Sequence, residues 1–418
     1  MPHSARSHSV SARLVTLVVA VVALAAPFLS STSSSASTAN GIAPALPRQA
    51  QVNLTYTPEM VATSHQYTQA QAVALAKRFD VIVAMPVSFS KYVQQMKAAN
   101  PNLVLLAYSN ATFATTANSS GLPESSFAHT TSGARIKSNN FHQTLMEPTD
   151  AQWRQRSISL CKQALAASGY DGCMEDMLTM AVFTPGYVTG LPVKPGTGQQ
   201  YSATQWRSAL INLVSSFRGS LGSNVLIGNA VGNAWSYWHN PVNTQPIVSS
   251  LPGAQMELFT RAAADPVTKW PTASEWMDYV NTIKSMESQA ISGLFGTKLW
   301  VSATAAQVKQ WEAYSMASFL MQANGYSYWA FTTSNSQAGA TGAKNPYSMP
   351  ATIGRPTGAM TAARNGTYSR TFANGITVVN PGSSTVTVPL PKRAKDLDGV
   401  WRTSVTLAAH SGSVLVYS

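Results

Sequence analysis

Three acidic residues follow short apolar segments at points where β-strands are expected to end. Glu175 and Asp176 lie in the segment YDGCMEDM, and Glu257 lies in AQMELFTR. An α/β barrel keeps its chemistry at the carboxyl ends of its strands. Hydrolysis of a glycosidic bond needs two carboxyl groups, one as nucleophile or base and one as proton donor. We therefore predict that Asp176 and Glu257 form a catalytic pair. The alternative is that Glu257 forms an ion pair with Arg261 at the end of its strand.

Alternation along the strand decides which of the two neighbouring acids faces the barrel axis. Successive side chains of a strand point to opposite faces, so Glu175 and Asp176 cannot both face inward. Cys161 lies in the helical stretch before this strand and Cys173 lies within the strand. An oxidising compartment permits them to pair, and the sequence leaves this open. If Cys173 faces the helices, Asp176 faces the barrel axis.

Other polar and aromatic residues at predicted strand ends fit a sugar-binding site. Aromatic rings stack on pyranose rings, while amide and guanidinium groups donate hydrogen bonds to hydroxyls. The segment NAWSYWHN is rich in aromatic residues directly after a strand, which favours a substrate platform. Packing or turn formation explains an Asn or Trp at such positions equally well. The residues predicted to contact substrate are Glu175, Tyr108, Asn110, Asn229, Trp235, Trp238, Arg261 and Trp329.

Eight apolar segments alternate with segments of helical periodicity between residues 40 and 345. Near-continuous apolar strands that alternate with helices indicate a parallel sheet, and eight such units favour closure into a barrel. We predict an α/β fold with a (β/α)8 TIM barrel; an open, doubly wound sheet is the alternative. The predicted strands are residues 50–56, 79–86, 102–110, 170–177, 224–232, 254–261, 298–304 and 326–331.

A change of pattern near residue 365 indicates a second domain. Short β-rich runs such as GITVVNP and SGSVLVYS are separated by Gly, Pro, Asn or Asp, with no helical periodicity between them. This pattern is typical of a small antiparallel β-domain. We predict a linker and a C-terminal all-β domain over residues 346–418, either a sandwich or a partial barrel.

The N-terminal residues 1–39 have the features of a secretory signal peptide. Two arginines precede the apolar run LVTLVVAVVALAAPFL, and small residues follow it. A retained membrane anchor is the alternative, although this run is shorter than the roughly 20 residues of a spanning helix. We expect a secreted protein with no membrane span after removal of the signal peptide.

The charge composition bears on possible partners. The chain carries a formal net charge of +12, with its Lys and Arg residues placed singly and in no nucleic-acid-binding motif. We expect a carbohydrate partner and no nucleic acid; electrostatic association with a cell wall is left open. The seven histidines have no metal-ligand spacing, and no nucleotide or esterase motif follows a strand. We therefore expect no metal and no cofactor.

The remaining acids are assigned to other roles. Asp80 and Asp171 lie where strands begin, at the end of a barrel that serves stability. Asp265 follows a strand in a loop and is a weak candidate for the site. Ten others are expected to be solvated in helices, loops or the β-domain: Glu59, Glu124, Glu147, Asp150, Glu275, Asp278, Glu287, Glu312, Asp396 and Asp398.

Several of these segments together resemble a known family. GYDGCMEDMLTM, SNVLIGNAVGNAWSYW and AQMELFTR resemble the hypothetical glycoside hydrolase-like family 15 over residues 79–331. FANGITVVNP is similar to the small β-domain that often follows glycosidase barrels. Asp176 and Glu257 match the acidic positions of the family pattern. Glu175 departs from it, because the pattern has an apolar residue there.

The resemblance implies an exported glycoside hydrolase that acts on a polysaccharide or oligosaccharide. Glycosidase barrels with acids on the fourth and sixth strands mostly cleave α-linked sugars with retention. By this analogy Asp176 is the nucleophile and Glu257 the acid/base residue. The alternative function is a non-catalytic barrel that binds carbohydrate or cell wall.

Overall fold

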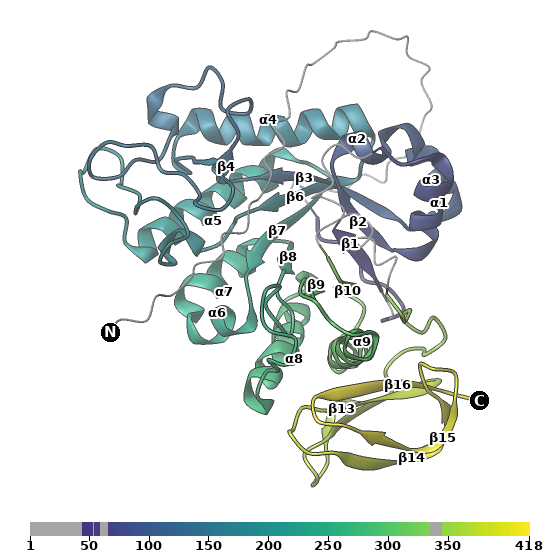
Figure 1. The fold of residues 1–418 in the computed structure, drawn as a ribbon. Helices are drawn as coiled ribbons and strands as arrows, with labels where there is room; N and C mark the ends of the chain where they lie inside the picture. The colour runs from purple at the N-terminus through teal and green to yellow at the C-terminus, as the bar shows by residue number, and fades with distance from the viewer. Residues whose placement is uncertain (1–43, 53, 59–65, 335–344) are drawn as a thin grey trace, which may run out of the picture. The chain divides into compact units, whose positions relative to one another are not determined.

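The computed structural model describes residues 44–52, 54–58, 66–334 and 345–418 (Figure 1). The predicted signal peptide and Glu59 lie outside the described residues. Those described belong to one compact unit. Among them, no helix is both long enough and apolar enough to cross a lipid bilayer.

Eight parallel strands form the predicted barrel, in the spatial order β1, β2, β3, β6, β7, β8, β9, β10. The circle is closed by a single parallel bridge between Thr55 and Trp329, where the Trp329 N–H donates to the Leu54 carbonyl at 3.0 Å. The strands are β1 Tyr56–Pro58, β2 Val81–Ala84, β3 Val104–Asn110, β6 Gly172–Asp176, β7 Val225–Val231, β8 Gly253–Met256, β9 Ser292–Lys298 and β10 Ser327–Thr332.

The strands are apolar on both faces because both faces are covered. One buried cluster, which we call the inner cluster, fills the barrel, and a larger one lies between strands and helices. In β7, for example, Val225 and Ile227 face inward while Leu226 faces the helices. The inner cluster comprises Leu46, Leu54, Tyr56, Val81, Val83, Leu106, Met174, Val225, Ile227, Leu294, Tyr328 and Ala330.

Helices follow most strands and begin at polar capping residues. Thr68, Ser202, Thr272 and Thr304 each form a capping box with a Gln or Glu three residues later, which satisfies N–H groups of the first turn. The helices are α1 Gln69–Arg78, α2 Pro86–Phe89, α3 Val93–Ala99, α4 Ala151–Ser168, α5 Ala203–Ser220, α6 Ala234–His239, α7 Pro241–Ser250, α8 Ala273–Ser288 and α9 Ala305–Leu320.

Two long loops extend from the carboxyl ends of β3 and β6. The first, residues 111–150, contains β4 Phe113–Ala114 and β5 Thr144–Leu145. The second, residues 177–202, pairs with it through a bridge between Ser138 and Val188 and through the Asn139 N–H, which donates to the Tyr187 carbonyl at 3.0 Å. The loops therefore form a joint rim on the carboxyl-end face of the barrel, the face that we call the mouth.

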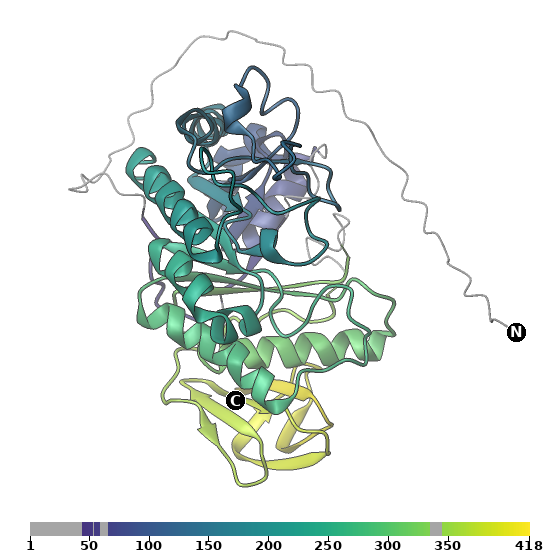
Figure 2. The ribbon, with the colours of Figure 1, turned by 90° about the vertical axis from the view of Figure 1, so that its left-hand side faces the viewer.

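The C-terminal domain is antiparallel, as predicted (Figures 1 and 2). Its six strands form one hydrogen-bonded sheet rather than two sheets, because β14 pairs with β15 along most of its length and with β16 at its end. The strands are β11 Thr361–Ala362, β12 Tyr368–Phe372, β13 Gly375–Asn380, β14 Val386–Lys395, β15 Trp401–Leu407 and β16 Ser411–Tyr417, in the order β11, β12, β13, β16, β14, β15.

This sheet packs on helix α9 of the barrel. Arg370 of β12 is buried and donates to the carbonyls of Leu320 and Ala323 at 3.0 Å and 2.8 Å, just past the last turn of α9. Gly412 at β16 approaches α9 so closely that a Cβ there would lie 2.7 Å from the Ala317 Cβ. The two domains therefore share a tight interface.

Three groups of predictions were wrong. The first strand is β1, which begins at Tyr56, where the predicted strand 50–56 ends. The seventh strand is β9, not residues 298–304, so Lys298 ends the strand instead of beginning it. Glu147, Glu287 and Glu312 are buried rather than solvated. Their carboxyl groups accept hydrogen bonds from Tyr201, Asn324 and Tyr347 at 2.7 Å, 2.7 Å and 3.0 Å, but burial still raises the pKa of all three.

Candidate active site

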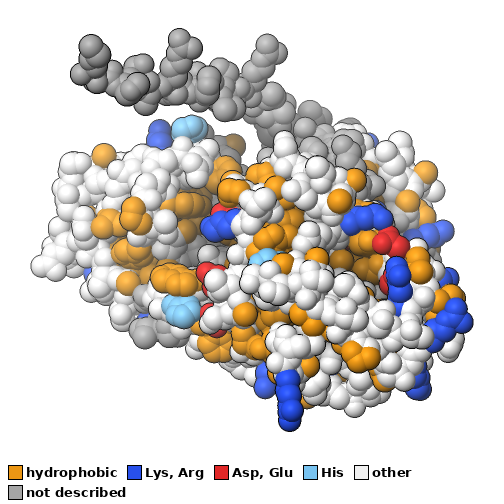
Figure 3. All heavy atoms as spheres, turned by 60° about the horizontal axis from the view of Figure 1, so that its bottom comes forward, with side chains coloured by type: hydrophobic (Ala, Val, Ile, Leu, Met, Phe, Trp, Pro, Cys, Tyr) orange, Lys and Arg blue, Asp and Glu red, His pale blue; other side chains and the backbone are white. Residues whose placement is uncertain are grey.

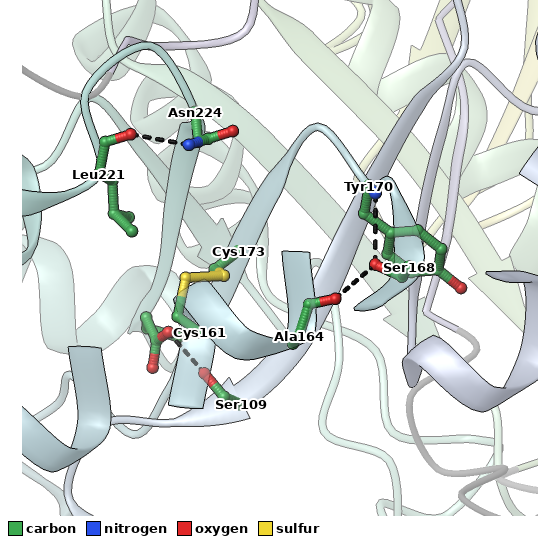
Figure 4. Close-up of a disulfide and its surroundings, with 9 residues drawn as sticks. Ser109, Cys161, Ala164, Ser168, Tyr170, Cys173, Leu221 and Asn224 are labelled. Carbon is green, nitrogen blue, oxygen red and sulfur yellow. Dashed lines mark hydrogen bonds between the residues drawn. A yellow bond between two sulfur atoms is a disulfide. The ribbon is translucent and has the colours of Figure 1, made fainter. Parts of the chain in front are cut away.

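Strand β6 turns Asp176 toward the barrel axis. Cys173 faces the helices and forms a disulfide with Cys161 of α4, so the bond that the sequence left open is present (Figure 4). Met174, on the other face of β6, belongs to the inner cluster. Because side chains alternate, Asp176 lies on the inner face and Glu175 on the outer one.

Asp176 and Glu257 meet over one side chain, Asn229. The Asn229 amide nitrogen donates to Asp176 Oδ1 at 2.8 Å and to Glu257 Oε2 at 3.0 Å, so these two oxygens lie at most 5.8 Å apart. Asn229 is itself only 4% exposed. It follows Val225 and Ile227 on the inner face of β7, as Glu257 follows Gln255 of β8. Three adjacent strands therefore bring the three polar groups together.

Further neutral donors surround Asp176. The Tyr108 hydroxyl of β3 donates to Asp176 Oδ2 at 2.6 Å, and the Met177 N–H donates to Oδ1 at 2.7 Å. Met177 has a positive φ of 62°, a conformation that a non-glycine residue rarely adopts. Asn110 accepts from the N–H groups of Thr112 and Phe113 at 3.1 Å and 2.8 Å, and so shapes the turn after β3.

Lys298 contacts Glu257, and the sequence analysis did not identify it. Its ammonium donates to Glu257 Oε1 and lies 4.5 Å from the centre of the Trp300 ring. The Lys298 side chain is 6% exposed, whereas that of Glu257 is 34% exposed. The cation is therefore enclosed by the protein, whereas the carboxylate that it contacts remains partly exposed. The ion pair predicted as an alternative, between Glu257 and Arg261, is not formed.

The surroundings of the two acids shift their pKa values in opposite directions. Burial and the nearby Glu257 charge raise the pKa of Asp176, although its three hydrogen-bond donors act against this shift. Burial would also raise the pKa of Glu257, but the Lys298 ammonium outweighs it and holds that pKa below its ordinary value. Such separation of two neighbouring carboxyl groups is typical of acid–base sites.

Tyr187 is a second residue of the site that the sequence analysis missed. It lies in the loop after β6, and burial, together with the charges of Asp176 and Glu257, raises its pKa to about 12. Its ring meets Phe113 edge to face at 6.3 Å. A tyrosine eleven residues beyond the end of a strand gives no periodic signal, so only the folded loop reveals its position.

The structure does not bring Glu175 to this cluster. Its carboxyl group is fully buried on the outer face of β6, where the Ser109 hydroxyl donates to it. Burial and the charge of Asp176 raise the pKa of Glu175 to about 8. It lies close enough to Cys161 and Cys173 to suggest a metal site, but the disulfide occupies both sulfurs. Direct contact of Glu175 with substrate is therefore incompatible with its position.

Two tryptophans predicted to contact substrate pack against the protein core, Trp329 fully and Trp238 in part. Trp329 lies on the outer face of β10, is 4% exposed and donates from its indole to Ser315 at 2.8 Å. Trp238 lies in helix α6, where its indole donates to the Asp278 carbonyl at 2.9 Å. The segment NAWSYWHN thus forms a short helix rather than a loop platform.

Trp235 and Arg261 line cavities formed by the segments that follow β7 and β8. Trp235 is 61% exposed on α6 and lines two neighbouring hollows, one toward the loop after β6 and one toward the loop after β8. Arg261 lines the second hollow, is 2% exposed and lies 4.7 Å above the Trp311 ring. Trp235 is thus open to a ligand, whereas Arg261 is mainly part of the wall.

The fold and this site define the class of protein. Two carboxyl groups at the carboxyl ends of parallel barrel strands are the arrangement of a glycoside hydrolase. Among solved structures, a pullulanase from an Anoxybacillus species, complexed with maltotriose, matches with a TM-score of 0.51 and 7% identity over 90% of this chain and 71% of that chain. An enzyme of glycoside hydrolase family 13, subfamily 31, matches with a TM-score of 0.50 and 9% identity over 88% of this chain and 99% of that chain.

The sequence identifies the family more closely. The model of hypothetical glycosyl hydrolase family 15 matches residues 97–376, which is more than half of the chain. The chain therefore belongs to this family, as its motifs predicted. No protein with a curated description matches the sequence significantly.

Proposed function

We propose that this protein hydrolyses glycosidic bonds of a polysaccharide or oligosaccharide with retention, using Asp176 and Glu257. The Asn229 bridge carries the proposal. Retaining enzymes separate their carboxyl groups by about 5 to 5.5 Å and inverting enzymes by about 6.5 to 9.5 Å. The upper limit of 5.8 Å between Asp176 Oδ1 and Glu257 Oε2 supports the first class.

We propose an α-linked substrate that extends beyond a single sugar. The positions of the acids on the fourth and sixth barrel strands support the α linkage, as does the shared fold of the pullulanase complexed with maltotriose. Trp235 supports the extended substrate because an exposed indole between two hollows offers a stacking surface to further sugars.

A panel of purified α- and β-linked glycans tests this function. We expect release of reducing sugars from at least one α-linked glycan, and NMR of the first product should show the anomer with the configuration of the bond that was cleaved. Release of the opposite anomer would refute retention. Binding without release of sugar from any glycan would favour the carbohydrate-binding barrel instead.

We also propose that the protein is exported and associates with anionic cell-wall polymers. The N-terminal sequence supports export, and a basic cluster on the C-terminal sheet supports association. Lys392 lies 5.5 Å from the Tyr417 ring, while Arg393 and Lys395 lie 5.1 Å and 5.9 Å from the ring of Trp401. None of these three cations forms an ion pair with an acid among the described residues. On the face shown in Figure 3, Lys and Arg side chains cover more of the surface than Asp and Glu side chains, and several lie next to an acid.

Replacing the basic cluster by glutamine tests the association. Co-sedimentation with polygalacturonate should weaken strongly in the triple variant of Lys392, Arg393 and Lys395, and in the wild type it should fall as salt rises. A control variant removes three exposed lysines of the barrel helices instead, Lys77, Lys162 and Lys284. An equal loss in both variants would assign the association to net charge and refute a role for the cluster.

A further inference from the structure

Lys298 distinguishes the two acids of the pair. Among the residues that the structure describes, it is the cation that contacts either acid, and it contacts only Glu257. Its side chain is almost fully enclosed, between Glu257 and the ring of Trp300. An enclosed ammonium strongly favours an ionised partner, because the alternative is an unpaired buried charge.

The groups that donate hydrogen bonds to Asp176 are all neutral. Its donors are the Tyr108 hydroxyl, the Asn229 amide and the Met177 N–H. A neutral carboxyl group also fits this arrangement. Oδ1 can still accept from Asn229 and Met177, while a proton on Oδ2 is donated to the Tyr108 oxygen.

Two carboxylates that share one amide nitrogen repel each other, so the pair favours a single retained proton. The other titratable groups near the pair are Tyr108, Tyr187 and Tyr56, whose pKa values are raised by burial and by the charge of Glu257, and Glu175, whose pKa is raised by burial and by the charge of Asp176. None of them supplies a positive charge. Lys298 therefore decides which acid keeps the proton.

We propose that Lys298 makes Glu257 the nucleophile and Asp176 the proton donor. The assignment rests on the proposed hydrolysis with retention, and it reverses the order that strand position predicts. Lys298 is a positioning residue in this scheme, because it acts through Glu257.

The bond changes follow from this assignment. Asp176 gives its proton to the glycosidic oxygen as the bond from that oxygen to the anomeric carbon breaks, and Glu257 Oε2 forms an ester with that carbon. A water then attacks the same carbon, gives one proton to Asp176, and releases Glu257 as a carboxylate. Both acids return to their first states, so the cycle is balanced.

Carboxyl ¹³C NMR tests the assignment without any substrate. The 16 Asp and Glu residues give a small set of signals. The signals of Asp176 and Glu257 are identified by their loss in Asp176→Asn and Glu257→Gln. We expect Glu257 to ionise at a lower pH than Asp176. Lys298→Met should raise the pH at which Glu257 ionises, and Lys298→Arg should leave that pH unchanged. Lys309→Met, which removes a surface ion pair with Asp398, is the control and should change neither signal. Ionisation of Asp176 below Glu257 in the wild type would overturn the proposal.

The catalytic roles are tested with azide and the 2,4-dinitrophenyl glycoside of the sugar that the wild type releases. This leaving group needs no proton. We expect Asp176→Ala with azide to give a glycosyl azide of retained configuration, and Glu257→Ala with azide to give the inverted one. The opposite pattern would overturn the assignment. If the wild type releases no sugar, the proposed hydrolysis fails, whereas the NMR titration still decides the protonation order.

Discussion

Asn229→Ala is the most informative single substitution, because Asn229 is the group that joins the two acids. It donates to Asp176 and Glu257 at 2.8 Å and 3.0 Å. A hydrogen bond to a charged group contributes about 1.5 to 3 kcal/mol. Because only one of the two acids is ionised at a time, Asn229 donates one hydrogen bond to a charged group. We therefore expect Asn229→Ala to lose about 3 kcal/mol of transition-state stabilisation, the upper end of this range. This corresponds to a fall in kcat/KM on the order of 100-fold.

The assay is kcat/KM on the glycan that the wild type cleaves, together with thermal unfolding. Asn224→Ala is a matched control: it removes an amide at the start of the same strand, which donates to the Leu221 carbonyl at 2.8 Å (Figure 4). It should lower stability by about 1 kcal/mol and leave kcat/KM unchanged. Equal kcat/KM for Asn229→Ala, Asn224→Ala and the wild type would refute the claim that the bridge organises catalysis.

Three further predictions follow from buried or exposed groups near the site. Because the pKa of Glu175 is raised to about 8, its contribution to stability is present at low pH and lost as pH rises toward 8. As pH rises from the ordinary pKa of a glutamate to about 8, the free energy of unfolding should fall by up to about 1.4 kcal/mol per pH unit. The fall should be less steep in Glu175→Gln. Replacing Cys161 and Cys173 by serine should cost about 3 kcal/mol in urea unfolding. Trp235→Ala should raise KM for long glycans several-fold but not for short glycosides.

Each of these has a result that contradicts it. Equal pH dependence of urea unfolding in Glu175→Gln and the wild type would mean that Glu175 is ionised in the folded protein. The serine double variant should match the reduced wild type; if it equals the oxidised one, the disulfide contributes nothing to stability. If Trp235→Ala changes KM equally for long and for short substrates, Trp235 does not stack on sugars beyond the bond that is cleaved.

The sequence predicts the architecture well because it depends on repeated, strong patterns. Eight apolar runs separated by helical segments indicate the barrel, and alternation relates Asp176 to Cys173 within one strand. The ends of β3, β6 and β7 fall close to their predicted positions. Tyr108, Asp176 and Asn229 each lie near such an end, and their side chains meet in the structure.

Residues whose position depends on packing were harder to predict. Strand β9 reads SGLFGTK, and its glycines made it resemble a loop; Gly296 is required because a Cβ there would lie 2.4 Å from the Tyr56 hydroxyl oxygen. Misplacing this strand concealed Lys298. Trp329 was predicted to contact substrate, but it faces away from the barrel interior. Its neighbours Tyr328 and Ala330 face the inner cluster, so alternation turns Trp329 outward.

The hydrolytic rates of Asp176→Asn and Glu257→Gln on the glycan that the wild type cleaves test the central claim most directly. Both substitutions keep the side-chain shape and remove the carboxyl group. We predict that each variant still binds the glycan and loses on the order of 1000-fold or more in rate, as expected for a missing acid–base or nucleophilic group. A near-wild-type rate in either variant would show that the two acids are not the catalytic pair.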